Sequence, residues 1–115
     1  MKSDLAIIIP YYKVSFFWET LESLSLQTDQ RFRVYIGNDA SPENPEPLIE
    51  EYKGRFDYTY QKFEENLGGV SLTGQWDRCV AMMKDEEWFI ILGDDDYLSP
   101  NAVEEFYKNV LFYNF

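Results

Sequence analysis

The sequence has 115 residues, a length that fits one domain, and its balance of 45% hydrophobic and 27% charged residues argues against a disordered chain. The formal net charge of −11 argues against nonspecific binding to nucleic acid and against an anionic membrane surface as the main partner. Nucleotides stay open as ligands, because a metal ion can bridge an acidic protein and an acidic ligand.

The cysteine and histidine content restricts the chemistry. Cys79 is the only cysteine, so an intrachain disulfide is impossible, and nothing indicates an oxidising compartment. The absence of histidine excludes the commonest general base, serine-type triads and His-ligated zinc sites. No apolar stretch approaches the ~20 residues that span a bilayer, and the polar start does not resemble a signal peptide. We therefore expect a cytoplasmic protein.

The first half of the chain alternates strand and helix patterns. Residues 5–9 form a branched apolar run that predicts a strand buried on both faces and ended by Pro10. Ser15 is expected to cap a helix that ends near residues 27–29 and whose apolar side carries Phe17, Leu21 and Leu24, with Trp18 as a further candidate. Residues 32–36 alternate as a second strand, and residues 37–47 form a loop rich in Gly, Asn and Pro. A short helix over 48–52 and an aromatic-rich strand over 58–63 follow.

The second half repeats the alternation. A turn over 66–69 leads into a helix over 70–83, and residues 88–92 predict a fourth, continuous and buried strand. After an acidic loop, Ser99 and Pro100 supply the N-cap and first position of a last helix. Its apolar side carries Val103, Phe106, Tyr107, Val110 and Leu111. This order predicts an α/β fold with right-handed crossovers and a mostly parallel sheet.

The last five residues, LFYNF over 111–115, include three aromatic rings and no charged residue. A helix that ends a complete domain rarely has so apolar a C-terminus, so we expect the domain to be truncated here. Exposed rings at Phe112, Tyr113 and Phe115 would then drive self-association. The alternative is a terminal segment that docks back on the core.

Three adjacent carboxylates, Asp94, Asp95 and Asp96, follow the fourth predicted strand. They repel each other unless a positive charge sits among them, and a hard divalent cation with oxygen ligands meets that need. Mg²⁺ or Mn²⁺ held there would keep positions open for phosphate oxygens. The alternative is a solvated acidic turn that leads into the helix capped by Ser99.

The other candidate residues also follow strands, and in an open parallel sheet ligands bind beyond the carboxyl ends of the strands. Tyr12 either packs or offers a flat ring to a nucleobase, and Asp39 either forms an Asx turn or accepts a base N–H. The glycines at 68–69 allow a close backbone approach or simply start a helix. We expect Trp76 in the core and Arg78 on the surface, with contact to a phosphate as the alternative for Arg78.

Taken together, these stretches resemble the nucleotide-binding half of a family 2 glycosyltransferase with the GT-A fold. They occur in the family's order and at its usual spacings, and with the elements between them they cover nearly the whole chain. The matching stretches are IIIPYYK (7–13), GNDAS (37–41), ENLGG (65–69) with GQWDRC (74–79), and LGDDDYLSP (92–100).

The resemblance implies a role for each matching position. Tyr12 corresponds to the aromatic residue that stacks on the base, commonly uracil, and Asp39 to the acid that recognises it. Gly93 stands where many members have a first Asp, which shifts weight to Asp94 and Asp95 and leaves the roles of the three acids open. The implied metal ligands, for Mn²⁺ or Mg²⁺, are Asp95 and Asp96. The implied nucleotide-binding residues are Pro10, Tyr11, Tyr12, Asp39, Asn66, Gly68, Gly69 and Asp94.

The function that the resemblance implies is metal-assisted, inverting transfer of a sugar from a nucleoside-diphosphate donor, commonly a UDP-sugar, to a hydroxyl of a saccharide or lipid-linked acceptor. Family members carry their general base in an acceptor half that follows this segment. We therefore expect residues 1–115 to be the donor-binding portion, inactive in transfer alone, and peripheral to a membrane only through a missing region or partners. The alternative is a non-catalytic nucleotide-binding or interaction module of the same fold. A cytidylyl- or uridylyltransferase has less support, because the loop after the first strand lacks the glycines typical of those enzymes.

Overall fold

The structure is a computed structural model that describes residues 4–113, with side chains described through residue 110. Its four strands are β1 (Leu5–Tyr11), β2 (Phe32–Asn38), β3 (Asp57–Lys62) and β4 (Trp88–Ile91). They form one parallel sheet in the order β3-β2-β1-β4. The helices are α1 (Phe17–Ser25), α2 (Glu46–Glu50), α3 (Leu72–Val80) and α4 (Ala102–Tyr113). The α/β fold with a parallel sheet is confirmed.

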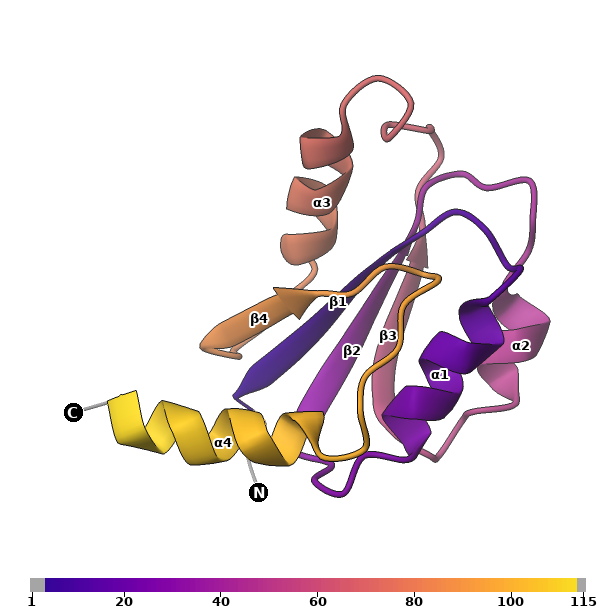
Figure 1. Cartoon of the computed structure of the whole chain (residues 1–115). Coiled ribbons are helices and arrows are strands. Elements are labelled where there is room, and N and C mark those ends of the chain that lie inside the picture. The colour runs from indigo at the N-terminus through magenta and orange to yellow at the C-terminus, as the bar shows by residue number, and fades with distance from the viewer. Residues whose placement is uncertain (1–3, 114–115) are drawn as a thin grey trace.

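The sheet separates two layers of helices (Figure 1). Alternate residues of β1 point to opposite faces: Ile7 and Ile9 pack with residues of α1, α2 and α4, whereas Ala6 and Ile8 pack with Cys79 of α3. Burial on both faces explains why β1 is a continuous apolar run. The loops that follow the strands therefore all emerge at one edge of the sheet.

The sequence predicts that Pro10 ends the first strand, and this prediction is wrong. β1 continues to Tyr11, and Pro10 lies opposite Gly37 of β2. Proline is tolerated here because β4 pairs with β1 only as far as Ile8 opposite Ile91, so no neighbouring strand needs the missing N–H on that side.

The predicted helix starts also need correction. Ser15 does not cap α1, whose N-cap is Phe16 without a side-chain hydrogen bond, and α4 begins at Ala102, three residues after Ser99. The third helix is shorter than residues 70–83. It begins after Ser71, whose hydroxyl caps it by accepting the Gly74 N–H, and it ends at Val80.

The predicted burial of the fourth strand is wrong. The four residues of β4 are between 36% and 47% exposed, because β4 is an edge strand whose one partner in the sheet is β1. Trp18, the further candidate for the core side of α1, is also exposed.

The predictions for Leu111, Phe112, Tyr113 and Phe115 concern side chains outside the described residues. Within residues 4–113, no helix combines the length and hydropathy needed to cross a membrane.

Candidate functional site

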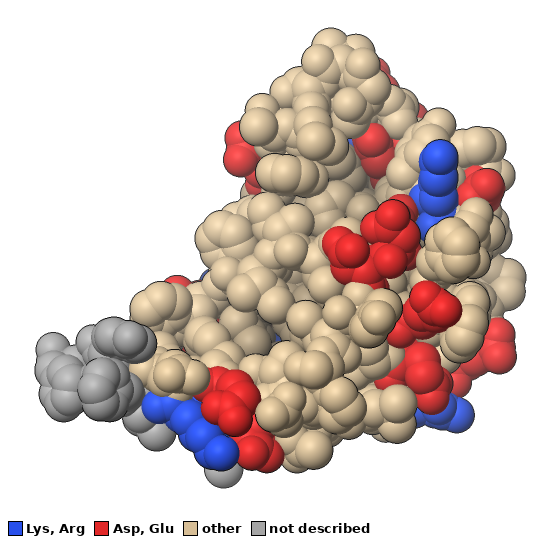
Figure 2. Space-filling model, viewed as in Figure 1, with Lys and Arg blue, Asp and Glu red and all other residues tan. Residues whose placement is uncertain are grey.

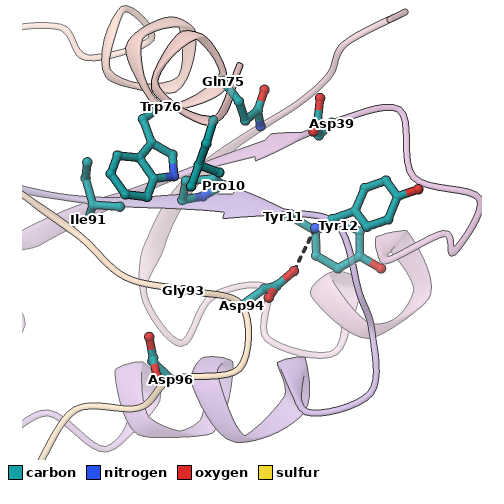
Figure 3. Close-up of a pocket in the computed structure, with 11 residues that line it drawn as sticks. Pro10, Tyr11, Tyr12, Asp39, Gln75, Trp76, Ile91, Gly93, Asp94 and Asp96 are labelled. Atoms are coloured by element: carbon teal, nitrogen blue, oxygen red, sulfur yellow. Dashed lines mark hydrogen bonds between the residues drawn. The ribbon is translucent and has the colours of Figure 1, made fainter. Parts of the chain in front are cut away.

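Loops that follow β1, β2 and β4 meet the first turns of α3 at the carboxyl edge of the sheet and enclose a pocket of about 370 Å³ (Figure 3). An adjoining pocket of about 330 Å³ shares Tyr12, Asp39 and Leu72 with it. The first pocket is lined by Pro10, Tyr11, Tyr12, Asp39, Leu72, Gln75, Trp76, Ile91, Gly93, Asp94 and Asp96. The second adds Asn66, Gly68 and Gly69. The structure thus brings together most of the residues singled out in the sequence.

The two adjacent tyrosines have different environments. The Tyr12 ring is 41% exposed and lines both pockets. The Tyr11 ring is fully buried: it packs on Phe17 with centroids 4.9 Å apart, and its hydroxyl donates to the Glu43 carbonyl over 2.7 Å. Burial raises the pKa of the Tyr11 phenol to about 12. The Tyr11 side chain points into the core, because successive side chains of a strand point to opposite faces. Tyr11 still lines the first pocket, and its nucleotide-binding role stays a prediction.

Asp39 is only 5% exposed, and its carboxylate is surrounded by donors of this chain. Oδ1 accepts the Leu67 N–H and the Arg78 guanidinium, each over 2.6 Å. Oδ2 accepts the Gly68 N–H over 2.9 Å and the Asn66 amide over 3.2 Å. Asp39 therefore fixes the 66–68 turn and anchors it to α3.

Two backbone features bring Asp39 and the turn together. A Cβ at Gly68 would lie 2.5 Å from Asp39 Oδ2, so glycine is needed for this close approach. Ala40 has a φ of 53°, a left-handed conformation that is uncommon for alanine. Backbone strain at Ala40 is thus part of the loop after β2 that carries Asp39.

Arg78 is partly buried, in contrast to its expected surface position. Beyond the pair with Asp39, its Nε donates to Gln75 Oε1, Nη2 donates to the Glu65 carbonyl, and the guanidinium lies 4.0 Å from the centre of the Phe63 ring. These contacts hold the guanidinium of Arg78 against Asp39 and the segment before the turn, and leave the side chain 23% exposed.

The three adjacent acids do not act as one cluster. Asp94 Oδ2 accepts the backbone N–H of Tyr12 over 2.7 Å (Figure 3) and that of Lys13 over 2.8 Å. A Cβ at Gly93 would lie 2.7 Å from Asp96 Oδ2 and 3.1 Å from Asp95 Oδ1. The carboxylates of Asp95 and Asp96 therefore converge over the glycine, and Asp94 turns away from them.

The acidic side chains suit a metal site that is completed by water and substrate phosphates better than one formed by protein ligands alone. Within residues 4–113, no three acidic, cysteine or histidine side chains are grouped to hold a metal ion. Mg²⁺ is commonly held by one or two carboxylates and completes its shell with waters and substrate phosphates. Two converging carboxylates, Asp95 and Asp96, fit that pattern. Figure 2 shows acidic side chains gathered around the loop that follows β4.

Sequence reasoning missed the contribution of α3. Trp76, expected in the core, lies at the pocket beside Pro10 and Ile91 (Figure 3). Leu72 and Gln75 come from the same helix, and their spacing with Trp76 is that of one helical face. The spacing of these three residues, shortly after the 66–69 turn, was the sequence signal that could have placed this face of α3 at the pocket.

Comparison with known proteins defines the family. The model of the family described as Glycosyl transferase family 2 matches residues 6–114. The chain belongs to this family. No curated protein sequence matches it significantly.

Solved structures show the same fold for this family member. The crystal structure of S. aureus TarS 1–349 in complex with UDP-GlcNAc matches 99% of this chain with a TM-score of 0.86 and 20% identity. The TarS 1–349 complex with UDP has the same TM-score and identity. The chain spans 32% and 33% of these two TarS chains, and 20% of the longer TarS chain.

Proposed function

We propose that this chain is the donor-binding domain of a glycosyltransferase that uses a nucleoside-diphosphate sugar. The observation that carries the proposal is the pocket at the carboxyl edge of the sheet, where an exposed tyrosine ring and an acidic loop face the same space. Membership of family 2 supports the reaction class, and the bound UDP and UDP-GlcNAc in the TarS structures favour a UDP-sugar.

In this proposal the base stacks on Tyr12, and Asp39 takes part in recognising its edge. The Oδ2 atom of Asp39 has the longer of its contacts, 2.9 and 3.2 Å, so it is the oxygen best able to accept a further N–H from a base. Asn66, Gly68 and Gly69 of the 66–69 turn line the adjoining pocket together with Asp39. Asp39 would thus act both as an acceptor and as the support of the turn.

The diphosphate would lie at the acidic loop, with Mn²⁺ or Mg²⁺ held by Asp95 and Asp96. When bound, such an ion supplies positive charge that stabilises the departing nucleoside diphosphate. The chain's own residues bind the base and position the donor. The ion also reconciles an anionic ligand with a net charge of −11.

The attacking hydroxyl needs a general base and an acceptor pocket, and we assign neither to residues 1–115. The acids of these loops already have roles: Asp39 supports the turn, Asp94 binds the β1 loop, and the carboxylates of Asp95 and Asp96 both lie over Gly93. The acceptor, a saccharide or a lipid-linked hydroxyl, would bind to other parts of a longer protein. This accords with the third of TarS 1–349 that the chain spans.

Calorimetry of UDP binding tests the proposal. We expect binding with Mn²⁺ or Mg²⁺ and much weaker binding with chelator, because without metal the acidic loop repels the diphosphate. The double variant Asp95→Asn/Asp96→Asn should lose the metal dependence, whereas Asp85→Asn, an exposed acid between α3 and β4, should behave as the parent chain. Equal affinity for UDP with and without metal would refute the metal site.

The base pocket is tested in the same assay. Tyr12→Ala should lose about 1–3 kcal/mol of uridine affinity if the ring stacks on the base. Tyr97→Ala, which removes an exposed ring outside this pocket, is the matched control. A folded Tyr12→Ala variant with unchanged affinity would leave Tyr12 as a surface ring. UDP bound tightly by a longer form of the protein that shows no sugar transfer would favour a non-catalytic binding module.

A further inference from the structure

Asp94 joins two loops that are distant in sequence. Its Oδ2 atom accepts the N–H of Tyr12 over 2.7 Å and that of Lys13 over 2.8 Å, across 82 and 81 residues. Figure 3 shows the Asp94 side chain reaching from the loop after β4 to the backbone of Tyr12. The carboxylate thus contacts the residue that carries the exposed ring.

These N–H groups lie where the sheet no longer pairs them. The β1–β2 ladder ends at Tyr11 opposite Asn38, and the β1–β4 ladder ends at Ile8 opposite Ile91. Tyr12 and Lys13 follow directly, so the sheet ladders do not pair their N–H groups. A carboxylate that accepts two backbone N–H bonds is a strong, charge-assisted partner for them.

The Tyr12 peptide is also held from the opposite side. The Ser41 hydroxyl donates to the Tyr12 carbonyl, and Ser41 belongs to the loop that follows β2. Tyr12 therefore has its carbonyl tied to one loop and its N–H tied to another. Of these two hydrogen bonds, the one to Asp94 connects Tyr12 to the acidic loop after β4.

The neighbouring acids leave Asp94 free for this contact. Asp95 and Asp96 converge over the position that a Cβ of Gly93 would take. Asp94 lies between Gly93 and these two acids in the chain, yet one of its carboxylate oxygens, Oδ2, binds the β1 loop. The three consecutive carboxylates are thus divided between two tasks.

From this arrangement we propose that Asp94 is a positioning residue: it sets the Tyr12 ring relative to Asp95 and Asp96, and does not itself contact the metal or the ribose. The inference rests on the proposed function, because it concerns how the same pocket is held. One carboxylate then couples the base end of a bound nucleotide to its diphosphate end.

The hydrogen bonds between Asp94 and the loop after β1 are tested without ligand, by amide hydrogen exchange of the parent chain and of Asp94→Ala. We expect the Tyr12 and Lys13 amides to exchange about tenfold faster in the variant, since each loses a charge-assisted acceptor. Asp95→Ala is the matched control and should leave both amides as in the parent chain. Asp94→Asn keeps one acceptor oxygen and should lie between the two. Unchanged exchange in Asp94→Ala would overturn the proposal.

Binding of uridine, which carries no phosphate, separates positioning from metal ligation. Asp94→Ala should weaken uridine binding about tenfold, equally with Mn²⁺ and with chelator, if it acts by ordering Tyr12. Asp95→Ala should leave uridine binding unchanged and weaken metal-dependent UDP binding. A loss in Asp94→Ala that appears only for UDP with metal would make Asp94 a metal ligand and overturn the proposal.

A double-mutant cycle with Tyr12→Ala separates positioning from a direct ribose contact. If Asp94 acts through Tyr12, its loss should cost little more in a chain that already lacks the ring. A full further loss in the Tyr12→Ala background would indicate direct contact and contradict the proposal. If the parent chain binds neither uridine nor UDP, the proposed function fails, and the exchange experiment still decides whether Asp94 holds the loop.

Discussion

At the scale of single residues, the site depends on carboxylates whose partners are backbone groups and one arginine. Asp39 binds Leu67, Gly68 and Arg78, and Asp94 binds the N–H groups of Tyr12 and Lys13. An acid in a loop is usually exposed, yet Asp39 is buried because it satisfies donors that would otherwise lack partners. Its chemistry is therefore structural before any ligand binds.

Replacing Asp39 should be costly for stability. Asp39→Asn removes the charge that pairs with Arg78 over 2.6 Å, and it places an amide group among donors. We expect a loss of about 2 kcal/mol in the free energy of unfolding, measured by urea denaturation.

The Asp29–Arg31 pair supplies the comparison. Its N–O distance, 2.7 Å, is close to the 2.6 Å of the Asp39–Arg78 pair, but its arginine side chain is 37% exposed against 23% for Arg78. Asp29→Asn should therefore cost less than about 1 kcal/mol. Equal losses in the two variants would show that burial adds nothing to the Asp39–Arg78 pair.

At the scale of elements, β4 stands apart from the other strands. It has four residues, it lies at the edge of the sheet, and its aromatic and branched side chains are exposed on both faces. Trp88 has an edge contact with Phe106 of α4, with centroids 6.1 Å apart. An exposed apolar edge strand offers both unpaired backbone groups and a hydrophobic surface.

The 115-residue chain should therefore self-associate through β4. We expect the mass measured by sedimentation to rise with protein concentration, because apolar edge strands pair with other chains. Phe89→Lys, on the exposed edge, should shift the chain toward monomer.

Leu26→Lys is the control, since Leu26 is an exposed apolar residue of the α1 C-cap, away from β4. A parent chain that stays monomeric at high concentration, or an equal effect of the two lysines, would exclude β4 as the contact.

At the scale of the whole molecule, the proposed function accounts for one half of a transfer reaction. The loops after the strands and α3 surround the carboxyl edge of the sheet, where an exposed ring, that of Tyr12, and two acids of the loop after β4, Asp94 and Asp96, line the pocket. In the proposed function, the residues assigned there bind and orient a donor. Attack by an acceptor requires a positioned base and an oriented hydroxyl.

We therefore expect the 115-residue chain to consume a UDP-sugar slowly, by hydrolysis, and to transfer little sugar. Loss of general-base assistance alone lowers the rate by roughly 10²–10⁴-fold, and loss of acceptor positioning lowers it further. A donor-consumption assay beside any longer form of the natural protein measures the difference. Robust transfer by the short chain that Asp95→Ala abolishes would show that it holds a base after all.

Much of the fold could be predicted from the sequence because its signals are local. Branched apolar runs, turn residues and alternating segments indicated four strands and four helices, and their order required parallel pairing. The motifs around Tyr12, Asp39 and the acidic loop indicated the site, since loops after parallel strands share one edge. Family resemblance supplied the reaction class, which matching of residues 6–114 to the family model supports.

By itself, then, the sequence determined the element order, the parallel sheet and the location of the candidate site at the carboxyl ends of the strands. Only the tertiary structure decided that β4 is an exposed edge, that Tyr11 is core while Tyr12 is not, and that Trp76 lies at the pocket. It also decided which donors Asp39 and Asp94 bind. Those partners lie up to 82 residues away in the chain. Local patterns fix which segments are helix or strand, but the partner of a side chain depends on how distant segments are brought together by burial of the apolar faces.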